Sequence, residues 1–344
     1  MTGNIAVRLE NVSRAFGTTA AANGISLDIA KGEIVSLVGH SGCGKSTLLR
    51  IISGVETVDS GRVFLDGREV DGQTFVEPEA RGVGFVFQDY ALFPHLNVRD
   101  NILFGLKRWP KAEAATAAEN IIHRIGIEHL ADRFPHTLSG GEQQRVALAR
   151  ALAPQPAVIL MDEPFSNLDQ GLRDKVRTDT LSLLRSLSAT AIMVTHDPQE
   201  ALSVGDRVVL MRSGEIVQAG SPYDLHDRPD NAYAAEFFCA FNKVAGQWHD
   251  GKFKTVFGSF AVASGAQKAG AATLYIRPRD VIVSLSGGNI PARISERVFY
   301  GDTEQLVLSI DGLETPLRAI MSERLPEGTD VVNIAIRPER LRVF

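Results

Sequence analysis

Residues 39–47 read Gly39-His40-Ser41-Gly42-Cys43-Gly44-Lys45-Ser46-Thr47. This stretch fits the pattern Gly, four residues, Gly-Lys-Ser, which is that of a phosphate-binding P-loop. Residues 33–38 are apolar and β-branched, as in a buried parallel strand, and residues 45–53 follow a helical period. A strand, a glycine turn and a helix N-terminus together form an anion hole. We therefore predict that Lys45 reaches the β- and γ-phosphates of a nucleotide and that the Ser46 hydroxyl ligates magnesium.

The composition is that of a globular protein with room for two domains. The chain has 344 residues, of which 44% are hydrophobic and 22% charged. A net charge of −5 gives no sign of a broad nucleic-acid surface, so we expect no nucleic-acid partner. One of the two cysteines lies in the phosphate loop, which favours a reducing compartment. No apolar run approaches the roughly 20 residues of a membrane helix, and residues 1–4 do not start a signal peptide.

Polar side chains follow three further apolar stretches that are typical of buried parallel strands. Gln88 follows residues 82–87, Asp162-Glu163 follows residues 157–161, and His196 follows residues 191–195. The carboxyl ends of parallel strands meet at the ligand edge of a sheet. We expect Asp162 to complete the magnesium shell with Ser46, and Glu163 to polarise the attacking water. Gln88 could touch magnesium or that water, and His196 could hydrogen-bond a γ-phosphate or an aligned water. The simpler interpretations are a surface strand end for Gln88, a strand-ending turn for Asp162-Glu163 and a helix cap for His196.

The pattern turns helical from residue 89 to about residue 154, which predicts a helical insertion. It ends in Leu138-Ser139-Gly140-Gly141-Glu142-Gln143-Gln144-Arg145, at the start of another helix. Ser139 and Glu142 fit a capping box, and a well-capped helix is one interpretation. Two glycines in a first helical turn cost about 1 kcal/mol each relative to alanine. They make sense where a phosphate approaches the backbone closely, so we predict a second anion-binding helix start at Gly140 and Gly141.

Two residues around the P-loop keep two interpretations each. Phe16 lies 23 residues before Gly39, where an early antiparallel strand can bring its ring beside the nucleotide. It is either a platform for adenine or a core phenylalanine. Cys43 is either a small residue that fits the loop or an oxidation-sensitive thiol that nucleotide protects.

Residues 243–344 are strand-like and contain an internal echo. Leu274-Tyr275-Ile276-Arg277-Pro278-Arg279-Asp280-Val281 resembles Ile334-Ala335-Ile336-Arg337-Pro338-Glu339-Arg340-Leu341. Repetition about 60 residues apart suggests two related β units, such as OB-like barrels. We place the domain boundary after residue 240.

Together these residues resemble the ATP-binding cassette (ABC) family. The motifs occur in that family's order, and they are the P-loop 39–47, Gln88, the signature 138–144, Asp162-Glu163, Asp169 and His196. The resemblance covers about residues 5 to 240 and implies an α/β P-loop NTPase domain over residues 1–240, with a helical subdomain at about 89–154. An all-β, OB-like regulatory domain follows over residues 241–344.

The resemblance also implies roles and a head-to-tail homodimer that binds ATP and Mg²⁺. Glu163 is then the general base and His196 contacts the γ-phosphate. Asp169 is a strut across the subunits, and Phe16 is the adenine platform. The nucleotide would touch the P-loop of one copy and the signature of the other: Gly39, His40, Ser41, Gly42, Cys43, Gly44, Lys45, Ser46, Thr47 and Gln88, with Ser139, Gly140, Gly141 and Glu142. Asn167 stands where alanine is usual.

The C-terminal region looks like that of binding-protein-dependent importers of the maltose, sulfate, polyamine and ferric-iron type. Residues 81–96 and 149–156 most resemble the ferric-iron importers, so we expect ferric iron as cargo. The resemblance implies two transmembrane permease subunits, a solute-binding protein and a peripheral position at the cytoplasmic face of the inner membrane. Residues 93–101 are a candidate groove for the permease. Three alternatives stay open: another solute (sulfate, polyamine, sugar or phosphonate), a soluble ATPase acting on DNA or ribosomes, and a binding-only regulator.

Overall fold

A computed structural model of the chain describes residues 4–249, 251–262 and 270–344. The chain forms two compact units, residues 1–225 and residues 226–344. The boundary expected after residue 240 falls within the second unit, between α8 (Ala232–Phe238) and β11 (Asn242–His249). A hydrogen bond of 2.7 Å from the Tyr275 hydroxyl to Glu236 ties α8 to the β-structure that follows it.

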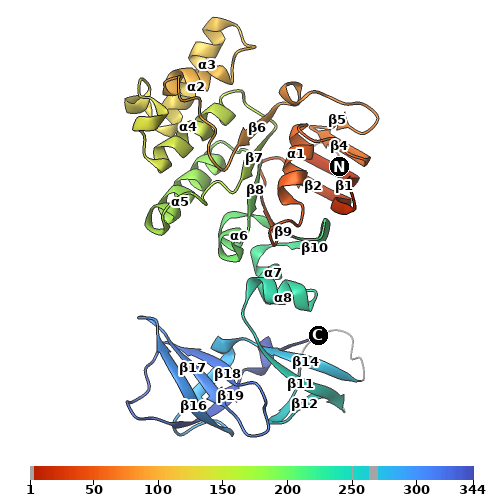
Figure 1. The fold of residues 1–344 in the computed structure, drawn as a ribbon, viewed down its shortest axis with the longest axis vertical. Coiled ribbons are helices and arrows are strands. Elements are labelled where there is room, and N and C mark those ends of the chain that lie inside the picture. Colours follow the sequence, from red (N-terminus) through yellow and green to blue (C-terminus); the bar gives the residue numbers. More distant parts are fainter. Residues whose placement is uncertain (1–3, 250, 263–269) are drawn as a thin grey trace. The chain divides into compact units, whose positions relative to one another are not determined.

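A six-stranded sheet forms the centre of the first unit (Figure 1). Its order is β10-β9-β3-β8-β7-β6, and every neighbouring pair is parallel except β10 with β9. The strands are β3 (Ile34–Val38), β6 (Val83–Val86), β7 (Val158–Asp162), β8 (Ala191–Thr195), β9 (Arg207–Arg212) and β10 (Glu215–Gly220). Every residue of β3 and β8 is buried, as expected for parallel strands covered on both faces. The carboxyl ends of β3, β6, β7 and β8 therefore lie at one edge.

A second, antiparallel sheet has the order β2-β1-β4-β5. Its strands are β1 (Ile5–Phe16), β2 (Thr19–Ala30), β4 (Ser60–Leu65) and β5 (Arg68–Asp71). Asp66 and Gly67 both have positive φ, +48° and +79°, which suits a two-residue hairpin turn between β4 and β5. Helix α1 (Lys45–Ser53) has the predicted bounds, buries its apolar side in a core that both sheets share, and is capped by Gly54.

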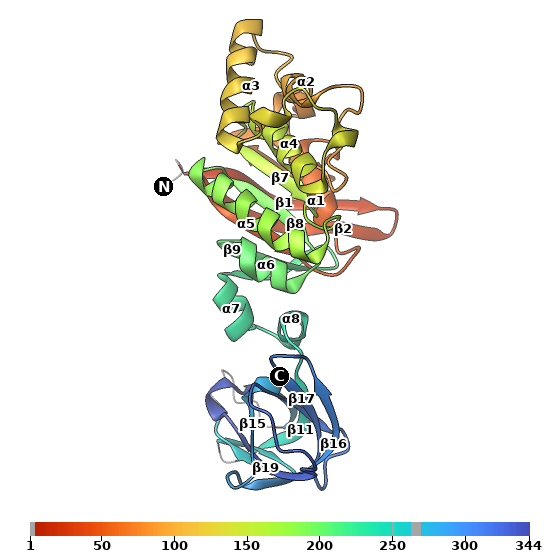
Figure 2. The ribbon, with the colours of Figure 1, turned by 90° about the vertical axis from the view of Figure 1, so that its left-hand side faces the viewer.

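The predicted helical block contains α2 (Val98–Phe104), α3 (Lys111–Ile125) and α4 (Gly140–Leu152). Figure 2 shows these helices gathered at one end of the unit. Their apolar side chains share a core cluster with β6, β7 and β8 and with α5 (Gln170–Ser186). Two further α-helices are α6 (Pro198–Val204) and α7 (Pro222–Asp227). Among the described residues, no helix is both long and apolar enough to cross a bilayer.

The second unit consists of two five-stranded antiparallel sheets, β13-β12-β11-β14-β20 and β15-β19-β16-β17-β18. Besides β11, the strands are β12 (Lys252–Thr255), β13 (Gly258–Phe260), β14 (Ala271–Ile276), β15 (Val281–Ser284), β16 (Ile290–Phe299), β17 (Glu304–Ser309), β18 (Leu317–Met321), β19 (Val331–Ile336) and β20 (Arg342–Val343). One hydrophobic cluster, which includes Phe253, Leu274, Leu306 and Ile334, packs strands of both sheets together.

The internal echo corresponds to a repeated strand–turn unit. After β14, the 3-10 turn Pro278–Asp280 leads into β15, which pairs with β19 of the other sheet. After β19, the turn Pro338–Arg340 leads into β20, which pairs with β14. Each copy of the repeated sequence thus passes its chain to the sheet of the other copy, and the two sheets are linked in both directions.

A buried arginine joins the end of α1 to the strand that leads to Gln88. The Arg81 side chain is fully buried, and its guanidinium donates to the carbonyls of Ile51 (2.8 Å) and Val76 (2.8 Å) and to a carboxylate oxygen of Asp71 (3.2 Å). It also donates to the Ile52 carbonyl (3.2 Å), and so binds the last turn of α1, whose carbonyls have no partner further along the helix.

We predict that Arg81→Met lowers the free energy of unfolding by about 3 kcal/mol, because it leaves Asp71 charged, buried and unpaired. Urea denaturation of the full chain measures the loss. Arg62→Met is the matched control, since Arg62 pairs with Glu10 at 2.6 Å but the two side chains are 47% and 33% exposed. That control should lose about 1 kcal/mol or less. Equal losses in the two variants would contradict the assigned role of Arg81.

Candidate functional site

The P-loop has a conformation that only glycine permits at two positions. Gly44, directly before α1, has φ +104°, and a Cβ there would lie 1.8 Å from the Ala21 carbonyl oxygen. Gly39 has φ +157°, and a Cβ there would lie 2.4 Å from the Met211 carbonyl oxygen. The loop is therefore clamped between β2 and the end of β9. Its position directs the unpaired N–H groups of the first turn of α1 to the sheet edge.

The Lys45 side chain folds back onto this loop. Its ammonium donates to the carbonyl oxygens of Gly39 (2.7 Å) and His40 (3.1 Å), and the residue is only 5% exposed. Cys43 is buried beside it, with Sγ 3.8 Å from the ammonium nitrogen. A buried cation above a ring of backbone N–H groups is suited to a polyphosphate.

The structure brings together two of the three predicted magnesium ligands. The Ser46 hydroxyl donates to the Asp162 carboxylate over 3.0 Å, which joins the first turn of α1 to the end of β7. Burial raises the pKa of Asp162; the Ser46 hydrogen bond opposes this rise, and the neighbouring charge of Glu163 adds to it. A hydroxyl and a half-buried carboxylate are the hard oxygen donors that Mg²⁺ prefers, so these residues fit the ion.

Glu163 and His196 form a pair at the ends of adjacent strands. The His196 Nδ1 atom lies 3.0 Å from the Glu163 Oε1 atom. The His196 side chain is 57% exposed and the Glu163 side chain 24%, so both are accessible from the sheet edge. Glu163 has φ +46°, an uncommon conformation for a non-glycine residue, and its N–H donates to the Val194 carbonyl over 3.0 Å. Strain of this kind gathers at functional sites, where the surrounding structure enforces it.

Gln88, the third predicted ligand, is positioned through its backbone. Its side chain is exposed and makes no hydrogen bond to the described residues, whereas its carbonyl accepts a 2.9 Å hydrogen bond from the Asn167 side-chain amide. The sequence marked Asn167 only as a departure from the family pattern. In the structure it links the segment after β6 to the segment after β7, which no spacing argument indicates.

The predicted second anion site lies apart from the P-loop. Ser139 and Glu142 form the predicted capping box at the start of α4: the Ser139 N–H donates to the Glu142 carboxylate over 2.7 Å. Figure 1 shows α4 in a different part of the unit from α1. A Cβ on Gly140 would lie 3.0 Å from the Leu168 side chain, and one on Gly141 would lie 3.0 Å from that of Val176. The glycines therefore also allow α4 to approach α5 closely, a reason that the sequence argument missed.

Asp169 starts a helix, and Phe16 lies exposed on a hairpin. Asp169 is the N-cap of α5, where its carboxylate accepts a 3.0 Å hydrogen bond from the Leu172 N–H. Phe16 is 47% exposed at the tip of the β1–β2 hairpin, with the Arg14 guanidinium 5.0 Å from its ring centre. Ala21, which backs Gly44, lies in the second strand of the same hairpin. Phe16 is thus a surface aromatic and not a core residue.

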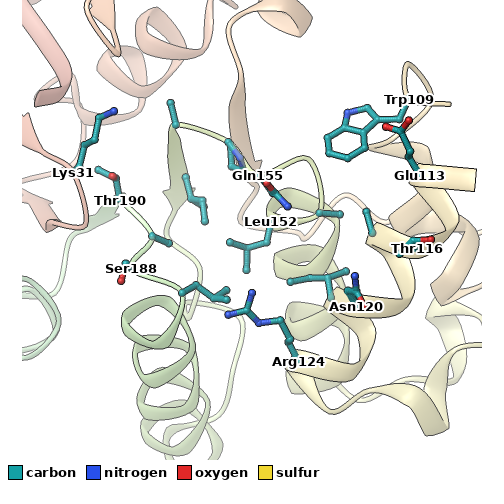
Figure 3. Close-up of a pocket in the computed structure, with 18 of the residues that line it drawn as sticks. Lys31, Trp109, Glu113, Thr116, Asn120, Arg124, Leu152, Gln155, Ser188 and Thr190 are labelled. Carbon is teal, nitrogen blue, oxygen red and sulfur yellow. The ribbon is translucent and has the colours of Figure 1, made fainter. Parts of the chain in front are cut away.

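A separate cavity of about 940 Å³ lies near the amino ends of the central strands (Figure 3). Trp109, Glu113 and Asn120 line it from the α3 side, and Ser188 and Thr190 line it from the segment before β8. None of the predicted nucleotide-binding residues lines this cavity. The predicted chemistry therefore belongs to the opposite edge of the sheet.

Comparison with known proteins agrees with this geometry. The family model described as ABC transporter matches residues 22–166. The sulfate/thiosulfate import ATP-binding protein CysA of Caulobacter vibrioides is 44% identical over 287 residues, covering 82% of this chain and 83% of its own. The Fe(3+) ions import ATP-binding protein FbpC of Agrobacterium fabrum is 41% identical over 304 residues, with coverage of 86% and 85%. The spermidine/putrescine import ATP-binding protein PotA of Nitratidesulfovibrio vulgaris is 40% identical over 320 residues, with coverage of 88% and 86%.

Two solved structures are also similar. The protein cbiO1 from Clostridium perfringens, described as part of the ABC transporter complex cbiONQ, has a TM-score of 0.59 and 30% identity, covering 64% of this chain and 90% of its own. The dimeric ATP-binding cassette MJ0796 bound to ADP and Pi has a TM-score of 0.54 and 32% identity, with coverage of 63% and 98%. With the P-loop, the Ser46–Asp162 contact and the Glu163–His196 pair in place, the chain belongs to the ABC transporter ATP-binding proteins.

Proposed function

We propose that this chain is the ATP-hydrolysing subunit of a binding-protein-dependent importer. The observation that carries the proposal is the Glu163–His196 pair, which lies one residue beyond the Ser46–Asp162 contact at the same sheet edge. A chain that only bound nucleotide would need the Lys45 and Ser46 side of the site but no exposed carboxylate beside a histidine. The names of the three relatives, all import ATP-binding proteins, support the importer class.

In this mechanism Lys45 and the N–H groups of the P-loop hold the β- and γ-phosphates. Ser46, Asp162 and the Gln88 side chain would hold Mg²⁺, which neutralises phosphate charge when bound. Glu163 orients the attacking water and accepts its proton. His196 holds the Glu163 carboxylate through Nδ1 and presents its other ring nitrogen to the γ-phosphate.

Hydrolysis in this proposal requires a second copy of the chain. The signature residues 139–142 begin a helix that lies apart from the P-loop of the same chain, so they serve the nucleotide of the other copy. Asp169, at the exposed start of α5, is the strut between the copies. Phe16 is the platform on which adenine stacks. The solved dimer of the similar cassette MJ0796 bound to ADP and Pi supports this arrangement.

We further propose that the two permease subunits bind the homodimer through an aromatic groove on each copy. The groove is lined by Phe85, Phe87, Phe93, Phe104, Trp109 and Arg150. The groove has a volume of about 790 Å³. Asn101 is fully buried and fixes its wall by hydrogen bonds with the N–H of Phe93 (2.8 Å) and the carbonyl of Leu96 (2.9 Å). A rigid apolar groove is suited to a short amphipathic helix. The subunit would then lie at the cytoplasmic face of the membrane, with a solute-binding protein reached through the permease.

Glu163→Gln should reduce kcat by about 100-fold or more, because the amide cannot accept the proton of the water. Binding of Mg-ATP should persist, since Lys45, Ser46 and Asp162 are unchanged, and ATP-bound dimers should accumulate. Phosphate release and light scattering measure the two effects. Glu128→Gln is the matched control: Glu128 lies 2.6 Å from the Nδ1 atom of His123, far from the P-loop in the sequence, and its loss should leave kcat unchanged. Unchanged turnover in Glu163→Gln would remove Glu163 as the base.

Phe104→Glu should abolish stimulation of hydrolysis by the permease while basal hydrolysis stays within about twofold, because the Phe104 ring contacts Phe93 within the groove, with ring centres 4.1 Å apart, and not the nucleotide site. Measurements with and without reconstituted permease separate the two. Phe75→Glu serves as control, since Phe75 is 46% exposed outside the groove. Equal loss of basal and stimulated activity would count against the groove.

Ferric iron remains the predicted cargo, and relatives named for sulfate and polyamine import match comparably. The test is to purify the tagged chain from detergent-solubilised membranes of its own source and to identify the proteins that accompany it. Calorimetry of the recovered solute-binding protein with Fe³⁺, sulfate and spermidine then names the cargo. Recovery of ribosomes or DNA-binding proteins, with no permease, would refute the importer and leave the ATPase site intact.

A further inference from the structure

A small polar chamber is lined in part by the Glu163–His196 pair. It has a volume of about 80 Å³, and its walls include Glu163, Arg173, Thr195, His196 and Glu200. These residues come from the end of β7, from α5, from the end of β8 and from α6. The proposed mechanism uses Glu163 and His196. It assigns no role to Arg173, Thr195 and Glu200.

Two polar atoms of this group are buried without a partner. The Glu200 Oε1 atom and the Arg173 Nε atom are both inaccessible to solvent, and neither has a hydrogen-bond partner among the described residues. One is an acceptor and the other a donor, and both residues line the same chamber. An orphaned buried polar atom costs about 1–3 kcal/mol, so such atoms normally reach an ordered water. The chamber is large enough, since one water needs only about 10–15 Å³ of such volume.

Glu200 connects the chamber to the turn that carries His196. Its Oε2 atom accepts a hydrogen bond from the Thr195 hydroxyl. The same hydroxyl accepts a 3.0 Å hydrogen bond from the Asp197 N–H. Thr195 and Asp197 directly precede and follow His196, so Glu200 fixes the backbone on both sides of the histidine. Burial raises the pKa of Glu200, whereas the Thr195 hydrogen bond and the charges of Arg177 and Arg173 oppose that rise.

Arg173 connects the chamber to the segment that ends in Asp169. Its Nη2 atom donates to the Leu168 carbonyl over 2.9 Å. Leu168 directly precedes Asp169, which caps the helix that carries Arg173. Arg173 thus holds the backbone directly before Asp169.

We propose that ordered water in the polar chamber bridges Glu200 and Arg173. Both are then positioning residues for the Glu163–His196 pair. Through them, the position of the Asp169 turn determines the geometry of that pair. The inference rests on the proposed function, since it concerns the same hydrolytic pair. A displacement of Asp169 by the second copy would move Leu168 and, through its hydrogen bond, Arg173. The bridging water would transmit this movement to Glu200, and the Thr195 hydrogen bond would transmit it to His196.

Steady-state hydrolysis by full-length variants tests the proposal. Glu200→Ala should lower kcat on the order of 10- to 100-fold, because small misplacements of catalytic groups have effects of that size. The KM for Mg-ATP should stay within about twofold, since no P-loop residue is touched. Glu200→Gln should recover kcat to within about threefold, because its amide can keep both the Thr195 contact and a water. Gln199→Ala, an exposed neighbour in the same helical turn, is the matched control and should behave as the wild type.

A double variant and a crystal structure distinguish positioning from a purely structural role. Glu200→Ala combined with Arg173→Met should lose no more activity than the worse single variant, because both disrupt the same bridge. A high-resolution crystal structure of the wild-type chain should contain a water within hydrogen-bond distance of Glu200 Oε1 and Arg173 Nε.

Three outcomes would overturn the proposal: unchanged kcat in Glu200→Ala, a dry chamber, or strictly multiplicative losses in the double variant. Failure of the proposed function itself is a different result. In that case the wild type would show no hydrolysis, or Glu163→Gln would retain it.

Discussion

The in-register pairing of three buried parallel strands is the constraint on which the site depends. Val38 of β3 pairs with Thr195 of β8, and Val194 of β8 pairs with Asp162 of β7. Because the three strands end within one residue of each other, the P-loop, the Asp162-Glu163 carboxylates and His196 leave the sheet at the same level. A slip of one residue in this pairing would turn side chains to the other face of the sheet and separate Glu163 from His196. The strands are apolar on both faces, and burial of both faces fixes their register. That register places the polar residues at the strand ends side by side.

The antiparallel sheet holds the phosphate loop from the other side. The Ala21 carbonyl lies where a Cβ of Gly44 would be, and the Gly214 N–H donates to the Cys43 carbonyl over 3.0 Å. The loop therefore has backbone neighbours on two sides before any ligand binds. Such preorganisation lowers the entropy that binding would otherwise cost. It also explains why Gly39 and Gly44 must be glycines for steric reasons as well as for phosphate approach.

The sequence predicted the parts of this molecule that short-range patterns determine. Helix α1 has the predicted bounds, the capping box of Ser139 and Glu142 is present, and the strand ends carry the predicted residues. Contacts between distant segments were not predictable, because no local pattern encodes them. Asn167 reads as a surface amide, and Glu200 as a carboxylate in the first turn of a helix, where the helix dipole alone would account for it. The fit of Gly140 and Gly141 against α5 was missed for the same reason, since the sequence offered only phosphate approach as their explanation.

Helix α5 connects features that the sequence placed in separate motifs. The glycines at the start of α4 lie against Leu168 and Val176, so the signature and the Asp169 turn share one packed surface. A rigid displacement of α4 would therefore displace α5, because close-packed side chains transmit strain and do not absorb it. Since Arg173 on α5 lines the chamber together with Glu163 and His196, such a displacement reaches the hydrolytic pair from within the same chain. In the proposed dimer, docking of a second copy on the signature would thus act on both nucleotides. It would act directly on the nucleotide whose site it completes, and through α5 on the nucleotide bound to the same chain.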